Sequence, residues 1–98
     1  MHVIARRTLL EYCELYPDAK DQLLAWYGDA KSAEWRRPTD IQAVYGNRVD
    51  FPGDKRVVFD IKGTGYRLVV IVEYQFKKVF IRWFGTHEEY DKINVMKV

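Results

Sequence analysis

The side chains best suited to chemistry lie near the end of the chain, in a Thr-His-Glu-Glu-Tyr-Asp segment. His87, Tyr90 and Asp91 stand at positions i, i+3 and i+4, so a helix would place all three on one face. Thr86 and Glu89 have the spacing of a capping box, which predicts that a short helix begins here. Imidazole and phenol groups can carry protons, so this face could supply general acid–base catalysis. A purely structural role for the same residues remains open.

Two arginines, Arg67 and Arg82, could bind an anion on which such groups act, because a guanidinium donates to phosphate oxygens through a fixed fork of N–H groups. RNA carries its own nucleophile, the 2′-hydroxyl, so a base, an acid and cations are enough to cleave its backbone. The pattern therefore points to cleavage of a phosphodiester without a metal ion. Simple binding of RNA or protein is the alternative.

Other kinds of site find less support in the sequence. His2 is far along the chain from His87, and no metal-ligand spacing occurs. The segment Gly63–Gly65 lacks the helix and lysine of a phosphate-binding loop, so it is predicted to be a turn. Cys13, the single cysteine, lies on an apolar stripe and excludes a disulfide framework. We expect neither a metal ion nor another cofactor.

Length and composition predict one domain over residues 1–98, with 48% hydrophobic and 15% aromatic residues. No apolar run approaches the roughly 18–20 residues that cross a bilayer, and the start lacks a signal peptide, so a cytoplasmic protein away from the membrane is expected. Sixteen basic and fourteen acidic residues are unevenly spread: residues 1–54 carry net −2 and residues 55–98 net +4. A basic half favours a phosphate-rich partner or, equally, a solvated face.

The first half predicts a short strand followed by two helices. Val3–Ala5 is β-rich, the first helix ends before Pro17, and Asp18 is expected to cap the second. Arg36–Pro38 is expected to close the second helix, and residues 38–54 to form an irregular connection, in which Ile41, Val44 and Tyr45 could make one helical turn. The apolar stripes that define the two helices are Leu9, Tyr12, Cys13, Tyr16 and Leu23, Trp26, Tyr27, Ala30.

The second half predicts three antiparallel strands over residues 57–61, 67–76 and 79–84, with Lys77-Lys78 as a tight turn. Helices followed by strands indicate an α+β fold in which both helices cover one face of the sheet. On this register the side chains facing the helices would be Leu68, Val70, Val72, Tyr74, Phe76, Ile81 and Trp83.

The same register makes a prediction about the candidate site. Arg82 would lie opposite Glu73, and Arg67 would point toward Glu88 beside His87. The two arginines would then be roughly 20 Å apart along the sheet. The start of the second strand and the terminal helix are expected to meet at one end.

Four segments of the second half resemble the HigB-type mRNA interferase toxins of the wider RelE/ParE superfamily. They are Val57–Gly63, Tyr66–Leu68, Phe80–Arg82 and Gly85–Ile93. The resemblance implies a RelE-like fold: two N-terminal helices packed on a small antiparallel sheet, with a short C-terminal helix. The sequence departs from the family pattern in the loop, where Asp-Ile-Lys-Gly-Thr stands in place of the common Asn-Ile-Gly-Gly-Asn, so the hydrogen bonding of this loop would differ.

The function that the resemblance implies is that of a type II toxin, a metal-independent endoribonuclease that cleaves mRNA, commonly on translating ribosomes, and arrests growth. It also implies a cognate antitoxin, often a helix-turn-helix protein, with oligomers forming only through that antitoxin. Two alternatives stay open: a ParE-like inhibitor of gyrase, and a noncatalytic module that binds RNA or protein.

The site residues follow from the same resemblance. Arg67 and Arg82 would hold the scissile phosphate, and His87 and Tyr90 would share the acid and base duties. Asp91 would orient His87 or contact a partner. The cations expected to bind flanking RNA are Lys55, Arg56, Lys62, Lys77 and Lys78.

Overall fold

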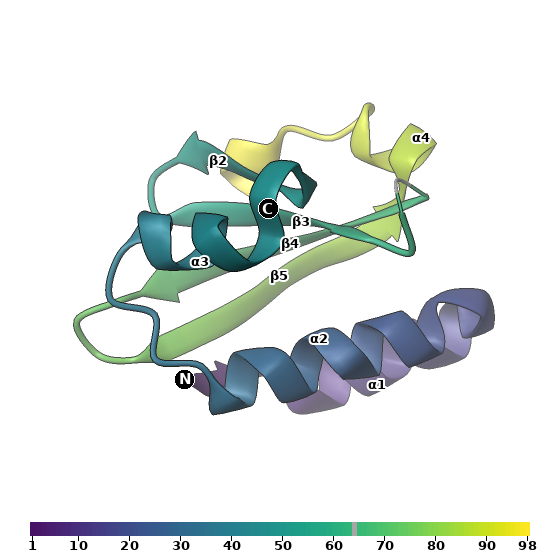
Figure 1. Cartoon of the computed structure of the whole chain (residues 1–98). Helices are drawn as coiled ribbons and strands as arrows, with labels where there is room; N and C mark the ends of the chain where they lie inside the picture. Colours follow the sequence, from purple (N-terminus) through teal and green to yellow (C-terminus); the bar gives the residue numbers. More distant parts are fainter. Residues whose placement is uncertain (64) are drawn as a thin grey trace.

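A five-stranded sheet forms the centre of the computed structural model, which describes residues 1–63 and 65–98 (Figure 1). The strand order is β1-β5-β4-β3-β2. The strands are β1 His2–Ile4, β2 Val49–Gly53, β3 Arg56–Ile61, β4 Tyr66–Glu73 and β5 Lys78–Thr86. The β3–β4–β5 meander confirms the predicted antiparallel strands. The predicted first strand is also present, and it pairs with β5 in parallel.

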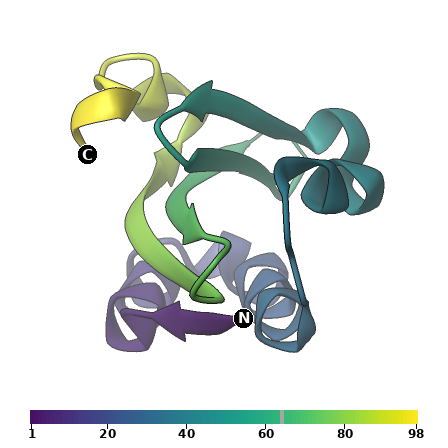
Figure 2. The same cartoon turned by 90° about the vertical axis from the view of Figure 1, so that its left-hand side faces the viewer.

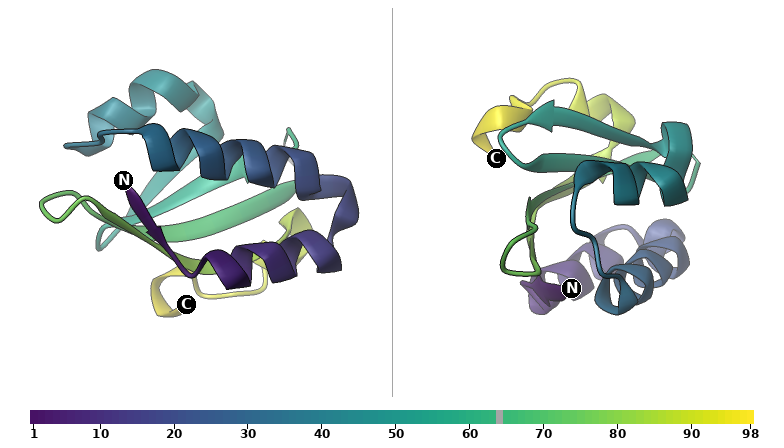
Figure 3. Two further views of the ribbon diagram at one scale, coloured as in Figure 1. Left: turned by 90° about the horizontal axis from the view of Figure 1, so that it is seen from below. Right: turned by 60° about the vertical axis from the view of Figure 1, so that its left-hand side comes forward.

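Helices α1 and α2 lie side by side across one face of the sheet, as predicted (Figures 1 and 3). The α-helices are α1 Arg6–Leu15, α2 Lys20–Ser32, α3 Pro38–Tyr45 and α4 His87–Tyr90. Short 3-10 turns occupy η1 Pro17–Ala19, η2 Gly46–Arg48 and η3 Val95–Lys97. In the part of the chain that the structure describes, no helix has the length and apolar character needed to span a membrane.

The segment from residue 38 to residue 54 contains α3 and β2, so its prediction as an irregular connection was wrong, although the helical turn allowed for Ile41, Val44 and Tyr45 falls within α3. Helix α2 already ends at Ser32, and Pro38 begins α3 instead of closing α2. A proline suits the first turn of a helix because its fixed φ is helical and its missing N–H is not needed there. Ile41 is the one fully buried side chain of α3. Eight residues with one buried side chain show little hydrophobic periodicity in the sequence. The helix is therefore stabilised by tertiary packing.

The aromatic centre of the core explains why α3 docks against the sheet. Phe59, fully buried on β3, is surrounded by three rings from three other segments. The centroids of Tyr45, Trp26 and Trp35 lie 4.9, 5.4 and 6.0 Å from that of Phe59. Aromatic contacts at these separations contribute about 0.5–1.5 kcal/mol each beyond area burial. Phe59 therefore joins α2, α3 and the intervening segment to one strand.

The β4–β5 register differs from the predicted one because the connection is longer than two residues. Glu73 pairs with Lys78, so residues 74–77 form the turn, and Phe76 is 65% exposed there. Arg82 therefore does not face Glu73, whose carboxylate lies 2.9 Å from Lys55 Nζ. The prediction that Phe76 faces the helices was wrong for the same reason.

A β-bulge in β5 moves a further side chain to the other face. Val69 pairs with Trp83 whereas Val70 pairs with Ile81, so Arg82 is the extra residue of β5. Val70 and Ile81 belong to the core under the helices, and Val69 does not. Trp83 therefore lies on the face opposite the helices, contrary to the prediction, because a bulge shifts the alternation of side chains by one.

The face opposite the helices carries the C-terminal segment, which crosses it near β2 (Figure 2). Val58 and Val69 are buried on this face. Arg56 is only 8% exposed, and its guanidinium donates to an Asp54 carboxylate oxygen at 2.9 Å and to the Val98 carbonyl at 3.0 Å. The helix-covered face is thus the main core, and the opposite face is partly open.

Asp18 does not cap α2, contrary to the prediction. It lies in η1, and its side chain accepts the Tyr66 hydroxyl at 2.6 and 2.7 Å to its two oxygens. Lys62 Nζ lies 3.3 Å from the same carboxylate. Asp18 therefore ties the beginning of α2 to the beginning of β4. Thr64, part of the predicted turn, lies outside the described residues; the Gly65 N–H donates to the Lys62 carbonyl at 3.2 Å across that turn.

We expect Asp18→Asn to remove a pH-dependent part of the stability. The hydrogen bond from Tyr66, helped by Lys62, lowers the pKa of Asp18 below its ordinary value of 3.8. A depressed pKa stabilises the fold above the unfolded-state pKa, and this stability is lost as the pH falls through the folded-state pKa. Urea unfolding should show the variant less stable near neutral pH, with the difference vanishing in acid. Exposed Asp21→Asn is the control, and a difference that persists unchanged in acid would contradict the prediction.

Candidate active site

The short helix α4 begins with the capping box that the sequence predicts. The Glu89 N–H donates to Thr86 Oγ1 at 3.1 Å, and the Thr86 N–H donates to Glu89 Oε1 at 2.8 Å. The hydroxyl of Tyr16, the residue that follows α1, donates to the same Glu89 oxygen at 3.0 Å. These hydrogen bonds, the one from the Thr86 backbone first, lower the pKa of Glu89. One carboxylate therefore fixes α4 both to its own strand and to the first helix.

The start of β4 and α4 meet at one end of the sheet, as predicted. The His87 N–H donates to the Gly65 carbonyl at 3.0 Å. Arg67 pairs with Gly85, one residue before the cap of α4. A Cβ on Gly85 would lie 2.7 Å from the Trp83 ring and 2.9 Å from Glu89 Oε1, so only glycine allows this close approach. The juxtaposition places His87, Arg67 and Tyr90 around one corner of the sheet.

Tyr90 lies over the open face beside the bulge. Its ring centroid is 6.1 Å from that of Trp83. Burial first, and then the carboxylate of Asp50, raise the pKa of Tyr90, and the charge of Arg67 works in the opposite direction. The phenol is therefore protonated at neutral pH, so it can donate a proton or a hydrogen bond.

His87 and Asp91 lie on the solvent-facing side of α4, at the predicted i, i+4 spacing. Nε2 of His87 is 3.5 Å from Oδ2 of Asp91, and the two side chains are 48% and 62% exposed. Asp91 is near enough to influence the orientation of the imidazole, and a substrate could reach both groups from solvent.

Arg67 is held by an acidic partner that the sequence analysis did not select as a site residue. Its Nε lies 3.1 Å from Asp60 Oδ1, and its Nη1 donates to the Tyr66 carbonyl at 3.2 Å. The two charged side chains are 14% and 19% exposed. Pairing β3 and β4 across the predicted Gly63–Gly65 turn would have placed Asp60 opposite Arg67. Asp50 was missed because β2 was not predicted.

Arg82 lies nearer to this corner than the predicted register allowed. It is three residues before Gly85, the partner of Arg67, which corresponds to roughly 10 Å along β5. Its side chain is exposed at the bulge. The corrected register thus roughly halves the expected separation of the two arginines.

The five cations expected to bind flanking RNA are dispersed. Lys55 pairs with Glu73 and Lys62 with Asp18. Arg56 is buried and bonded to Asp54. Lys77 and Lys78 are exposed and lie where β5 begins, at the opposite end of this strand from α4. The burial of Arg56 favours a structural role for it.

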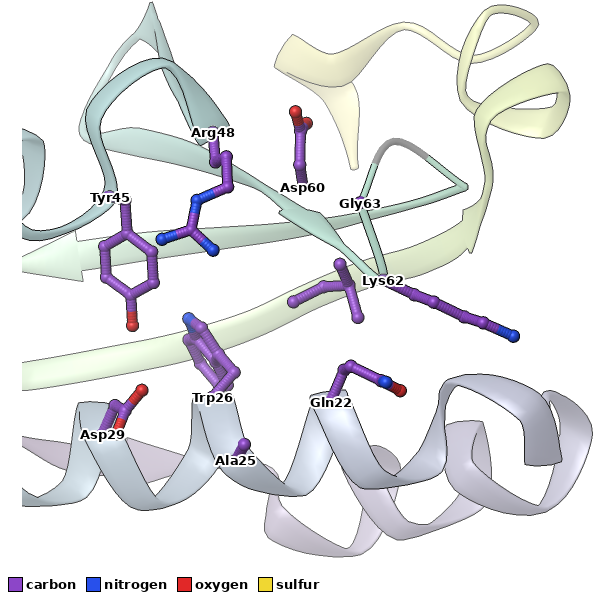
Figure 4. Close-up of a pocket in the computed structure, with 10 residues that line it drawn as sticks. Gln22, Ala25, Trp26, Asp29, Tyr45, Arg48, Asp60, Lys62 and Gly63 are labelled. Atoms are coloured by element: carbon purple, nitrogen blue, oxygen red, sulfur yellow. The ribbon is translucent and has the colours of Figure 1, made fainter.

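A separate hollow of about 330 Å³ opens between α2 and β3 on the helix side of the sheet (Figure 4). The Asp60 carboxylate points away from α2 there, toward the face that carries Arg67 (Figure 4). Residues that line the hollow are Gln22, Ala25, Trp26, Asp29, Tyr45, Arg48, Asp60, Ile61, Lys62 and Gly63. Within residues 1–63 and 65–98, no three His, Cys, Asp or Glu side chains are grouped closely enough to hold a metal ion.

The site geometry coincides with a family match. Residues 19–93 match the model of the HigB toxins, described as the RelE-like toxic component of a toxin–antitoxin system. The chain belongs to the HigB toxin family. The matched span includes Arg67, Arg82, His87, Tyr90 and Asp91.

Curated HigB relatives cover nearly the same length. The chain is 33% identical over 92 residues to the mRNA interferase toxin HigB of Escherichia coli K12, across 93% of this chain and 88% of that one. It has the same similarity to the mRNA interferase HigB of Shigella flexneri. A second HigB, from Escherichia coli O6:H1, is 26% identical over 94 residues, across 95% and 91% of the two chains.

The HigB toxin fold is confirmed here at the level of an α+β structure with a mostly antiparallel sheet. The two N-terminal helices and the short C-terminal helix are present, with α3 and the strand β2 added to the predicted arrangement. The catalytic and RNA-binding roles of individual residues stay predictions.

Gly85→Ala should lower the free energy of unfolding, because the added Cβ would overlap the Trp83 ring. Overpacking of this kind costs about 1–3 kcal/mol. The matched control is Gly28→Ala on α2, where a Cβ meets nothing within 4 Å and should stabilise the helix by about 1 kcal/mol. Urea unfolding of both variants measures the two changes. Equal stability of Gly85→Ala and the wild type would show that the corner can relax.

Proposed function

We propose that this HigB protein is a type II toxin that cleaves mRNA, with the corner formed by Arg67, His87 and Tyr90 as its active site. The observation that supports this most is the meeting of α4 with the start of β4, where the His87 N–H donates to the Gly65 carbonyl and the charge of Arg67 acts on the protonated phenol of Tyr90. The relatives described as mRNA interferases support RNA as the substrate.

The proposed reaction uses the 2′-hydroxyl of RNA as the nucleophile. His87, in its neutral form, accepts the 2′-hydroxyl proton as that oxygen attacks the adjacent phosphorus. The bond from phosphorus to the 5′-oxygen breaks, and Tyr90 donates its proton to that leaving oxygen. The products are a 2′,3′-cyclic phosphate and a 5′-hydroxyl end. Arg67 and Arg82 offset the charge that builds on the phosphate oxygens.

The protonation of Tyr90 supports this division of roles. A phenol with a raised pKa stays protonated at neutral pH, so it serves as an acid better than as a base. Exposed His87 can be regenerated by exchange with water. These groups need no metal ion for the balance of protons and charge.

The proposed setting is the cytoplasm, on mRNA engaged by translating ribosomes. The exposed Lys77 and Lys78 would contact the backbone of ribosomal or messenger RNA away from the reacting phosphate. A cognate antitoxin, of the helix-turn-helix type common in the family, would neutralise the toxin, and higher oligomers would form through it.

His87→Ala should abolish growth arrest and the appearance of new mRNA 5′ ends after tightly controlled induction in bacteria. Loss of one acid or base typically lowers the rate about 10²–10⁴-fold. His2→Ala is the matched control, because His2 is also exposed but lies at the far end of β5. Mapping of mRNA 5′ ends, with circular dichroism to check folding, gives the result.

The alternatives give different patterns in the same experiment. Growth arrest with intact mRNA and a DNA-damage response would favour the ParE-like inhibition of gyrase. Persistent RNA binding without cleavage, with and without ribosomes, would favour the noncatalytic module. New 5′ ends made equally by His87→Ala and the wild type would remove His87 from the site.

Tyr90→Phe tests the proton donor separately. The ring can still pack on Trp83, so the fold should be unchanged, while cleavage slows by at least about a hundredfold. A substrate in which sulfur replaces the 5′-oxygen at a mapped cleavage site has a leaving group that needs no proton. Cleavage of this substrate should be nearly equal in Tyr90→Phe and the wild type; an equal defect on both substrates would exclude the acid role.

A further inference from the structure

We propose that Asp60 is a positioning residue for Arg67 that also weakens the binding of RNA to the active site. This inference rests on the proposed function, because it assigns a regulation of that same site. Asp60 and Arg67 are directly opposite each other in β3 and β4, and Nε and Oδ1 are 3.1 Å apart.

The contact fixes the guanidinium in one orientation. Asp60 binds the Nε edge, and the Tyr66 carbonyl accepts from Nη1 at 3.2 Å. Two anchors on different nitrogens, both on the rigid strand pair β3–β4, define the plane of the group. A fixed orientation matters because a guanidinium recognises a phosphate through a planar fork of donors.

The same contact introduces an unfavourable charge. Both side chains are less than one-fifth exposed, so solvent screens the Asp60 carboxylate only partly. Asp50, Asp91 and Asp60 all act to raise the pKa of Tyr90, and Arg67 acts against them. The surroundings of Tyr90 therefore hold three carboxylates. An entering phosphate meets these negative charges as well as the arginine.

Asparagine separates the two effects of Asp60. Its Oδ1 can accept the same hydrogen bond from Arg67 Nε, but it carries no charge. Alanine removes both the hydrogen bond and the charge. Asp60→Asn should therefore tighten RNA binding while keeping the arginine oriented, and Asp60→Ala should tighten binding while losing the orientation.

The test compares the wild type, Asp60→Asn and Asp60→Ala in binding and in cleavage. Binding uses a fluorescent single-stranded RNA with 2′-O-methyl groups throughout, which lacks the nucleophile and cannot be cleaved. Cleavage uses an mRNA with a mapped site on purified translating ribosomes, with kcat and KM measured separately. Asp21→Asn, an exposed change of the same charge on α2, controls for net charge.

Removing one like charge from beside the phosphate is expected to tighten binding of the uncleavable RNA about tenfold at low salt, in both Asp60 variants. The gain should shrink as salt screens the charges. In cleavage, Asp60→Asn should lower KM with kcat near that of the wild type, whereas Asp60→Ala should lower kcat at least about tenfold. Asp21→Asn should stay within about twofold of the wild type in both assays.

Failure of this inference is distinct from failure of the proposed function. Wild-type affinity in Asp60→Asn would overturn the charge effect, and equal kcat in Asp60→Asn and Asp60→Ala would overturn the positioning effect. Tighter binding by Asp60→Asn when no protein cleaves RNA would overturn the nuclease but retain the charge effect. Absence of RNA binding by all three proteins would overturn both.

Discussion

One oxygen atom, Oε1 of Glu89, is the point on which the open corner of the molecule depends. It accepts hydrogen bonds from the Thr86 backbone and from the Tyr16 hydroxyl, and a Cβ on Gly85 would lie only 2.9 Å from it. Helix α4 has only four residues, too few to be stable alone. Its position, and hence that of His87, is set by this contact with Tyr16, directly after α1, and with the end of β5.

The sequence was sufficient to predict those elements that depend on residues close together in the chain. The capping box of α4 and the strands of the meander follow from residue types and spacing, and they were predicted correctly. Side-chain pairing between distant segments was harder. Asp18 looks like a helix cap, but the Tyr66 hydroxyl offers it a partner 48 residues away. Helix α3 depends on burying Ile41 and on the rings around Phe59, which no short window contains.

The meeting of α4 with the start of β4 was predicted from the sequence, and the remaining geometry around them only in part. Helix α4 and the start of β4, where Arg67 lies, come together as expected, because β5 pairs with β4 and leads directly into α4. The position of Arg82 depended on the length of one turn and on one extra residue in β5, and neither is encoded by alternation of side chains. Asp50 and Asp60 are brought near Tyr90 by the pairing of β2, β3 and β4. The acidic surroundings of Tyr90 were therefore found only in the structure.

The parallel pairing of β1 with β5 has a consequence for how the toxin forms during synthesis. His2 is paired with Lys78, so the first strand to be made must wait for the last one. Contacts between such distant parts of a chain form late, because closing a long loop costs entropy before the contacts repay it. The hydroxyl of Tyr16, directly after the helix that follows β1, must likewise wait for Glu89. A nascent chain therefore cannot complete the corner that holds His87 until the residues from β1 through Glu89 have all been translated.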